Sequence, residues 1–127
     1  MNVLLDTHAL IWYIEGNKKL STHTIEIIEN TDNTIFVSKA SLWEMAIKMS
    51  LEKLKLSIPF EKLEVFLDEN EFSILDYTFK HLNMLLKLPF FHGDPFDRLI
   101  ISQAIADDLK IITHEETFNQ YAVKVLR

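Results

Sequence analysis

The sequence contains no cysteine, which excludes disulfides, cysteine-ligated zinc, iron–sulfur clusters and thiol nucleophiles together. Its only two glycines, Gly16 and Gly93, are too few for the GxGxxG and Walker A loops that cradle phosphates. Neither a GxSxG nucleophile elbow nor an HExxH zinc motif is present. The histidines lack the spacing of zinc ligands and occur at His8, His23, His81, His92 and His114. The side chains that remain for chemistry are the carboxylates.

Long hydrophobic runs are also missing. No stretch approaches the roughly 18 apolar residues of a membrane-spanning helix. The initial MNVLLD reaches Asp6 before it attains the length of a signal peptide. We therefore expect a cytoplasmic protein with no membrane partner. A chain of 127 residues that is 48% hydrophobic fits one domain, residues 1–127. Its core is large enough for the chain to fold without disulfides or a structural metal.

Positive charge is in deficit, with 13 basic residues against 19 acidic ones and a net charge of −6. This balance argues against a module that binds nucleic acid through its overall field. It leaves room for an enzyme that places cations between its own carboxylates and a phosphate. Lys39, Lys48, Lys53 and Lys55 are candidates for contacting a nucleic-acid backbone, although such lysines are more often simply solvated.

Short apolar runs alternate with helical patterns along the whole chain. Strands are expected at residues 3–5, 34–37, 72–75, 111–112 and 123–126. Helices are expected at 7–15, from the cap Ser21 to about 30, from Ser41 to about 51, at 59–67, 78–87 and 95–109, with a helical turn at 116–121. This order predicts an α/β fold, with a mostly parallel five-stranded sheet between helices on both faces. Ligands of such folds lie beyond the carboxyl ends of the strands.

Acidic residues stand at those carboxyl ends and at the helix starts that follow. Asp6 follows the first strand and Glu44 the second, Asp94 and Asp97 open the long helix at 95, and Glu115 with Glu116 follows the fourth strand. Taken singly, several of them are good helix caps: Ser41 and Glu44 have capping-box spacing, and Asp94 precedes a proline at the first helical position.

Capping explains why acids begin helices, but it does not explain why four separate segments deliver carboxylates to one crevice. Several carboxylates at close range raise one another's pKa unless a cation lies among them. Ligand sets made only of oxygen suit Mg²⁺ or Mn²⁺. Such ions activate water and stabilise both oxygens of an in-line displacement at phosphorus, so phosphodiester hydrolysis is the matching reaction.

At these residues the sequence resembles the PIN-domain family, specifically the VapC-like ribonuclease toxins of type II toxin–antitoxin systems. The matching stretches are LLDTHALIW at residues 4–12, VSKASLWEMAIK at 37–48, LPFFHGDPFDRLIISQA at 88–104 and IITHEETF at 111–118. They occur in the family's order across nearly the whole chain. The resemblance implies a three-layer α/β/α sandwich, an endoribonuclease dependent on Mg²⁺ or Mn²⁺, an RNA substrate, a cognate antitoxin and a homodimer.

The resemblance also implies which residues form the site. Asp6, Glu44 and Asp97 would hold metal, with a fourth acid at Glu115 and an additional one at Asp94. The family usually has aspartate where this chain has Glu115, whose longer side chain must fold back to reach the same ion. Thr7 and Thr113 would support the site through hydroxyl hydrogen bonds or bridging waters, unless their hydroxyls only satisfy the local backbone. Arg98 would contact substrate phosphate or form a structural ion pair with Asp94.

Two other functions remain open on the sequence. In a non-catalytic binding protein of the same fold, the acids would act only as helix caps. A phosphatase that forms an aspartyl-phosphate on Asp6 would need a second aspartate two residues later, where this chain has His8. The phosphatase therefore ranks well below the nuclease.

Overall fold

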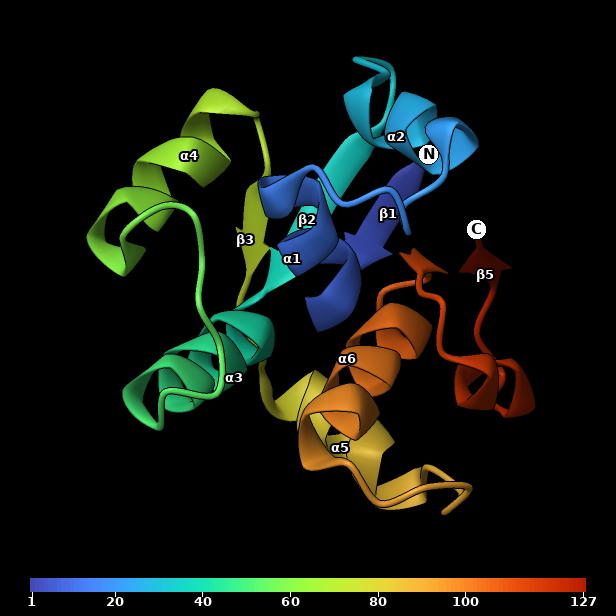
Figure 1. Cartoon of the computed structure of the whole chain (residues 1–127). Coiled ribbons are helices and arrows are strands. Elements are labelled where there is room, and N and C mark those ends of the chain that lie inside the picture. The colour runs from blue at the N-terminus through green and yellow to red at the C-terminus, as the bar shows by residue number, and fades with distance from the viewer.

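The protein is described by a computed structural model that covers residues 1–127. All five strands of its single sheet are parallel, in the order β3-β2-β1-β4-β5. The strands are β1 (Asn2–Leu5), β2 (Thr34–Ser38), β3 (Ser73–Leu75), β4 (Lys110–Ile112) and β5 (Val125–Leu126). The expected α/β architecture is confirmed, and the sheet is parallel throughout (Figure 1).

The helices are α1 (Thr7–Glu15), α2 (Thr22–Glu29), α3 (Lys39–Ser50), α4 (Leu63–Glu69), α5 (Phe79–Lys87) and α6 (Pro95–Ala106), with 3₁₀ turns η1 (Phe60–Lys62) and η2 (Glu116–Gln120). Local signals place several ends correctly: Gly16 adopts the left-handed φ of 61° that ends α1, and the Ser21 side chain caps α2. The predicted start of α3 at Ser41 is wrong. Ser38 caps this helix through the backbone N–H of Ala40, three residues earlier.

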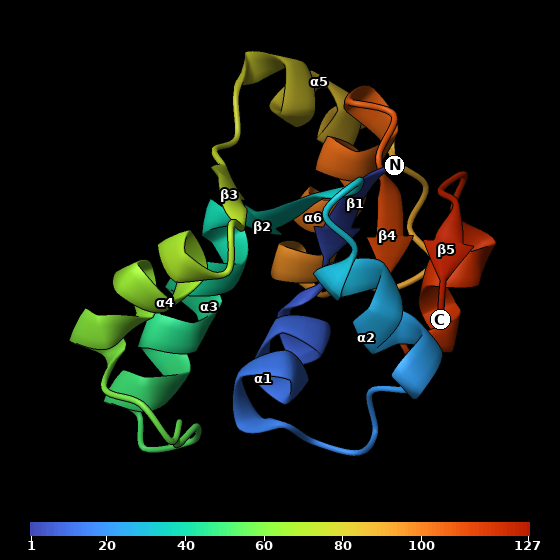
Figure 2. The ribbon, with the colours of Figure 1, turned by 90° about the horizontal axis from the view of Figure 1, so that it is seen from above.

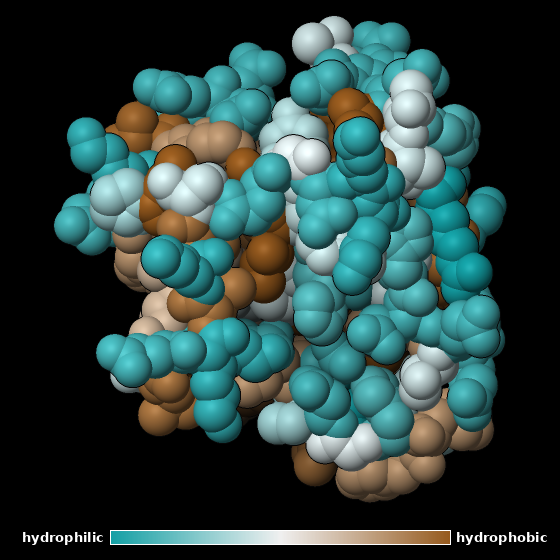
Figure 3. Space-filling model, viewed as in Figure 1, coloured by the Kyte–Doolittle hydropathy of each residue, from teal (hydrophilic) through white to brown (hydrophobic).

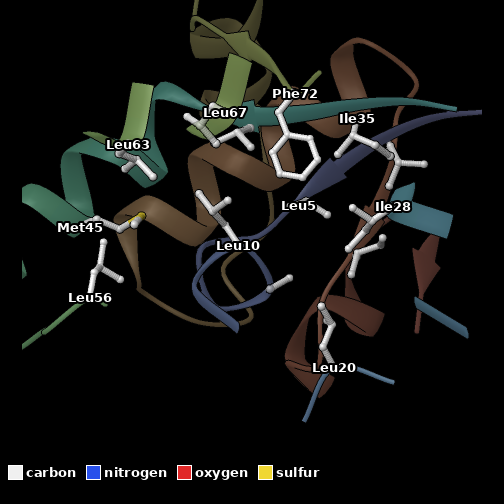
Figure 4. Close-up of a cluster of buried hydrophobic side chains, with 14 residues drawn as sticks. Leu5, Leu10, Leu20, Ile28, Ile35, Met45, Leu56, Leu63, Leu67 and Phe72 are labelled. Atoms are coloured by element: carbon white, nitrogen blue, oxygen red, sulfur yellow. The ribbon is translucent and has the colours of Figure 1, made fainter. Parts of the chain in front are cut away.

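Helices cover both faces of the sheet (Figure 2). Side chains alternate along β1, so that Val3 and Leu5 face one layer of helices and Leu4 faces the other. The first face packs on α1, α2 and α4, where Leu10, Leu67 and Phe72 join a cluster that also includes Met45 of α3 (Figure 4). The second face packs mainly on α6, through side chains that include Ile100, Ile101 and Ala104. The two clusters hold the sheet from both sides, and the acidic residues follow the strand ends of this packed sheet.

The strand order reverses between β1 and β4. The chain proceeds from β1 through β2 to β3 on one side, and later adds β4 and β5 on the other. This reversal is the topological switch point at which parallel α/β sheets form their ligand crevice. Asp6 follows β1 and Thr113 follows β4, so both lie at this switch point.

No helix is long and apolar enough to cross a lipid bilayer. The face seen in Figure 3 is largely hydrophilic over α1 and α2, while hydrophobic residues gather on the side formed by α3 and α4. Large exposed apolar side chains on that side include Leu51, Phe60 and Val65, and Phe79, Leu86 and Phe90 are exposed on and after α5.

Candidate active site

Asp6 is buried at the centre of the switch point, with 1% of its surface exposed. Its backbone N–H donates to Ile112 O at 3.0 Å, which continues the pairing of β1 with β4. Its Oδ1 accepts the Ala9 N–H at 2.8 Å and caps α1. Burial raises the pKa of Asp6, and hydrogen bonding to the Thr113 side chain and to Ala9 offsets part of that effect. The capping role therefore accounts for one carboxylate oxygen, and hydrogen bonding to Thr113 is a second contact of the carboxylate that capping does not explain.

Glu44 lies within α3 and has no capping role, because the helix already begins at Lys39. The predicted capping box with Ser41 is therefore wrong. Only 5% of Glu44 is exposed, and its Oε2 accepts from Lys48 Nζ at 2.8 Å one helical turn later. Its Oε1 is buried without any hydrogen-bond partner. A buried carboxylate oxygen without a donor is costly, and such atoms are characteristic of ligand sites.

Asp94 and Asp97 both belong to the start of α6, where their roles differ. Asp94 Oδ1 accepts the Asp97 N–H at 2.9 Å and caps the helix. Asp97 leaves its own carboxylate free of backbone contacts. Burial raises the pKa of Asp97 to about 7, with further contributions from the negative charges of Asp94, Asp6, Glu44 and Glu115, in that order.

The carboxylates of four segments therefore lie within electrostatic range of Asp97. They come from the end of β1, the second turn of α3, the start of α6 and the loop after β4. No three of them are drawn together tightly enough to form a preassembled ligand cluster. Like charges at close range repel one another, and a bound cation would offset that repulsion.

Glu115 is at the exposed rim of this group. About half of its side chain is accessible, and its Oε1 lies 3.7 Å from Nδ1 of the equally exposed His8. Its backbone N–H donates to Thr113 Oγ1 at 2.9 Å, which holds the turn after β4. Glu116 begins η2 and is also exposed. Glu115 is thus less firmly held than Asp6, Glu44 and Asp97.

The two threonines occupy different places. Thr7 Oγ1 donates to Ser41 Oγ at 2.9 Å in the buried layer, and this bond ties α1 to α3. Thr113 is fully buried between Asp6 and Glu115, so it contacts the acidic site directly. Thr113 supports a carboxylate, while Thr7 supports the helix that carries Glu44.

Arg98 points away from the acids. It is 5% exposed, and its guanidinium donates to Pro89 O at 2.8 Å and to Leu88 O at 3.3 Å. The ring of Phe90 stacks on it, 3.7 Å from the guanidinium carbon. The alternative that Arg98 pairs with Asp94 is wrong, because every guanidinium contact fixes the loop that precedes α6 and its neighbour Tyr121.

Two contacts of the site were not foreseen from sequence. Lys48, considered only as a backbone-binding lysine, forms the ion pair with Glu44, and the i,i+4 spacing of the two residues was the available signal. His92 Nε2 lies 3.3 Å from Asp97 Oδ2. No periodicity marks that pair, because it depends on the path of the loop. Lys39 pairs with Asp76 instead of remaining free.

The donor set fits a hard divalent cation. Every candidate ligand atom is a carboxylate oxygen, the Oε1 of Glu44 is buried without a partner, and the pKa values of Asp6 and Asp97 are raised. A divalent ion would supply the missing contact and the missing positive charge together.

The fold and the site define a parallel α/β protein with a group of acidic residues at the switch point of its sheet. The chain belongs to the PIN domain family, whose family model matches residues 3–124. It is similar to Ribonuclease VapC22 of Mycobacterium tuberculosis (strain ATCC 25618 / H37Rv), with 29% identity over 120 residues that cover 94% of this chain and 91% of the relative.

Solved structures share the fold. One is VapBC2 from Rickettsia felis bound to a DNA fragment from the promoter, with a TM-score of 0.74 and 23% identity, covering 99% of this chain and 98% of that one. Another is DNA-bound VapBC from Salmonella typhimurium, with a TM-score of 0.70 and 18% identity, covering 99% and 97%. At these identities the likeness establishes the PIN architecture.

Proposed function

We propose that this protein is a divalent-metal-dependent endoribonuclease of the VapC type, which hydrolyses RNA phosphodiester bonds as the toxin of a toxin–antitoxin pair. The observation that carries the proposal is the buried Oε1 of Glu44, which has no hydrogen-bond partner. It belongs to a group of acids from four segments whose charges, together with burial, raise the pKa of Asp97. Membership of the PIN domain family and similarity to a protein named as a ribonuclease support the same reaction.

Asp6, Glu44 and Asp97 are the proposed metal ligands, because Asp6 and Glu44 are buried and the Asp97 carboxylate, unlike that of Asp94, is not used to cap α6. Asp94 contributes charge from its capping position, and Glu115 acts from the rim. A bound Mg²⁺ or Mn²⁺ lowers the pKa of a coordinated water and neutralises charge on the phosphate. The chain itself holds the carboxylates at the carboxyl edge of the sheet and, through Thr113 and Lys48, orients Asp6 and Glu44.

The binding-protein alternative explains part of the site. Asp6 and Asp94 are indeed caps. Capping leaves Glu44 unexplained, since it lies inside a helix with an unpartnered buried oxygen. It also leaves the Asp97 carboxylate unexplained, because that group caps no helix. These two residues favour the nuclease.

The proposed macromolecular partners are an RNA substrate, a cognate antitoxin and a second copy of the chain. Complexes named VapBC share the fold. Exposed apolar side chains such as Phe79, Leu86 and Phe90 form surface of the kind that partners cover. Trp12, in contrast, packs partly against the core and beside His114. Lys53 and Lys55 remain exposed for contact with an RNA backbone. Molar mass in solution, alone and after co-expression with the protein encoded next to it, tests both protein partners.

The direct test is cleavage of labelled RNA by the purified protein. We expect cleavage with Mg²⁺ or Mn²⁺, none with EDTA, and none in Asp6→Asn, which keeps the shape of the side chain and removes its charge. Glu116→Gln is the matched control, because Glu116 is exposed and does not contribute to the shift of Asp97. Wild-type cleavage by Asp6→Asn, or cleavage that survives EDTA, would refute the proposal.

A further inference from the structure

The phenol of Tyr121 is surrounded by hydrogen-bond donors. The backbone N–H groups of Phe91 and His92 each lie 3.2 Å from its oxygen, and Arg98 Nη1 lies 3.3 Å away. The shortest contact, at 2.8 Å, is with His92 Nδ1. A phenol has one proton to donate, and neither an amide N–H nor a guanidinium can accept it. Among these four neighbours only His92 Nδ1 can accept, so we assign the Tyr121 hydroxyl as the donor to His92 Nδ1.

This donation fixes the tautomer of the imidazole. A neutral histidine whose Nδ1 accepts carries its proton on Nε2. Nε2 is the atom that lies 3.3 Å from Asp97 Oδ2. The ring is also held in place by edge-on packing against Tyr121, with centroids 5.4 Å apart, and by Phe118 at 6.1 Å.

The contact matters because His92 is the only hydrogen-bond partner of the Asp97 carboxylate. Asp97 sits at the start of α6, where its own N–H is used by Asp94. Without His92, nothing in the protein would fix the rotation of this carboxylate. Some residues hydrogen-bond a metal ligand without contacting the metal themselves. Mutation of such a residue typically weakens metal binding by about 10- to 100-fold.

We propose that Tyr121 and His92 form a relay in which the phenol sets the imidazole tautomer and the Nε2–H orients Asp97, so that one carboxylate oxygen is held and the other is left for a ligand. His92 and Tyr121 are positioning residues in this inference. It rests on the proposed function for its catalytic meaning, while the relay itself is a property of the folded chain.

The tautomer can be measured without metal or RNA. Two-dimensional ¹H–¹⁵N spectra that resolve both ring nitrogens should show His92 of the wild-type protein, above the pH at which the ring is protonated, as the Nε2–H form. In Tyr121→Phe this preference should be lost. An Nδ1–H form in the wild type, or an unchanged tautomer in Tyr121→Phe, would overturn the relay even if the protein proves to be an active ribonuclease.

Metal affinity tests the effect on Asp97. Titration calorimetry with Mn²⁺ should show about 10-fold weaker binding to His92→Ala. His92→Gln should largely restore it, because the amide nitrogen of glutamine can replace Nε2–H as a donor. His23→Ala, at an exposed histidine on α2, is the control. Equal losses in His92→Ala and His92→Gln would indicate packing alone and refute the inference. A wild-type protein that binds no Mn²⁺ would instead refute the proposed function, and the tautomer measurement would still decide the relay.

Discussion

Lys48 Nζ lies 2.8 Å from Glu44 Oε2 and places a positive charge beside the buried carboxylate of the acidic site. Hydrogen bonding to Glu44 raises the pKa of Lys48, burial opposes this effect, and the charges of Glu44, Asp94 and Asp97 add to it. The Lys48 ammonium group therefore neutralises part of the negative charge of the carboxylates gathered at this end of the sheet.

Replacement of Lys48 by methionine should destabilise the metal-free protein, because Glu44 then keeps a buried charge without a counterion. Loss of one partner of a fully buried pair costs about 3–5 kcal/mol. Since 41% of the Lys48 side chain is exposed, we expect about 1–2 kcal/mol. Urea unfolding measures the change, and saturating Mg²⁺ should abolish most of it. Lys53→Met, at an exposed lysine, is the control, and equal losses in the two variants would contradict the prediction.

Asp97 should make the stability of the metal-free protein depend on pH. Its pKa in the folded protein, about 7, lies above its ordinary value of 3.8, so the folded state holds the proton more tightly than the unfolded state. Stability from this group is fully present below pH 4 and is lost as pH rises towards and through 7. Allowing for partial exposure, the loss should be about 2 kcal/mol.

The variant Asp97→Asn isolates this effect, because an amide does not titrate. Urea unfolding at several pH values should give a flatter profile for Asp97→Asn, with the variant more stable than wild type at pH 8. RNA cleavage should nevertheless be lost. Asp108→Asn, at an exposed acid beyond the end of α6, should keep the wild-type profile. If stability depended on pH in the same way for wild type and Asp97→Asn, the pKa of Asp97 would not be raised by folding, and the prediction would be wrong.

Glu115 should contribute less to activity than the enclosed acids. Its side chain is about half exposed and faces His8 at the rim of the site. We expect Glu115→Gln to lower the rate of RNA cleavage about 10-fold, as is typical for a group that supports a metal through its outer contacts. Asp6→Asn, measured with the same RNA and Mn²⁺ concentration, should lose activity entirely. An equally complete loss in Glu115→Gln would make Glu115 a direct ligand.

Arg98 should act on stability rather than on substrate binding. Lysine cannot reproduce both carbonyl contacts and the stacking on Phe90. We therefore expect Arg98→Lys to lower the free energy of unfolding by about 1–3 kcal/mol. Thermal unfolding and the KM for RNA distinguish the two roles. If Arg98→Lys kept the wild-type melting temperature but raised the KM for RNA, the prediction would be wrong and Arg98 would contact the substrate phosphate.

Much of the fold follows from short-range patterns. The strand at 3–5, the helix at 7–15 and the left-handed residue Gly16 were predictable because each depends on neighbours within a few residues. The start of α3 was misplaced because Ser38 and Ser41 are both good caps by sequence. Ser38 is the cap in the folded chain, where its hydroxyl also donates to Gln103 Oε1 at 2.6 Å. That partner lies 65 residues away, so no local window contains it.

The sequence by itself determined which residue types could carry chemistry and where they follow strands, since hydrophobic periodicity and the absence of cysteine are properties of the chain alone. Only the tertiary structure decided that Glu44 keeps an unpartnered oxygen, that Arg98 turns to the loop carbonyls and that His92 reaches Asp97. These outcomes depend on how loops and helices pack across the sheet, and the energies that select them come from burial and from contacts between segments far apart in sequence.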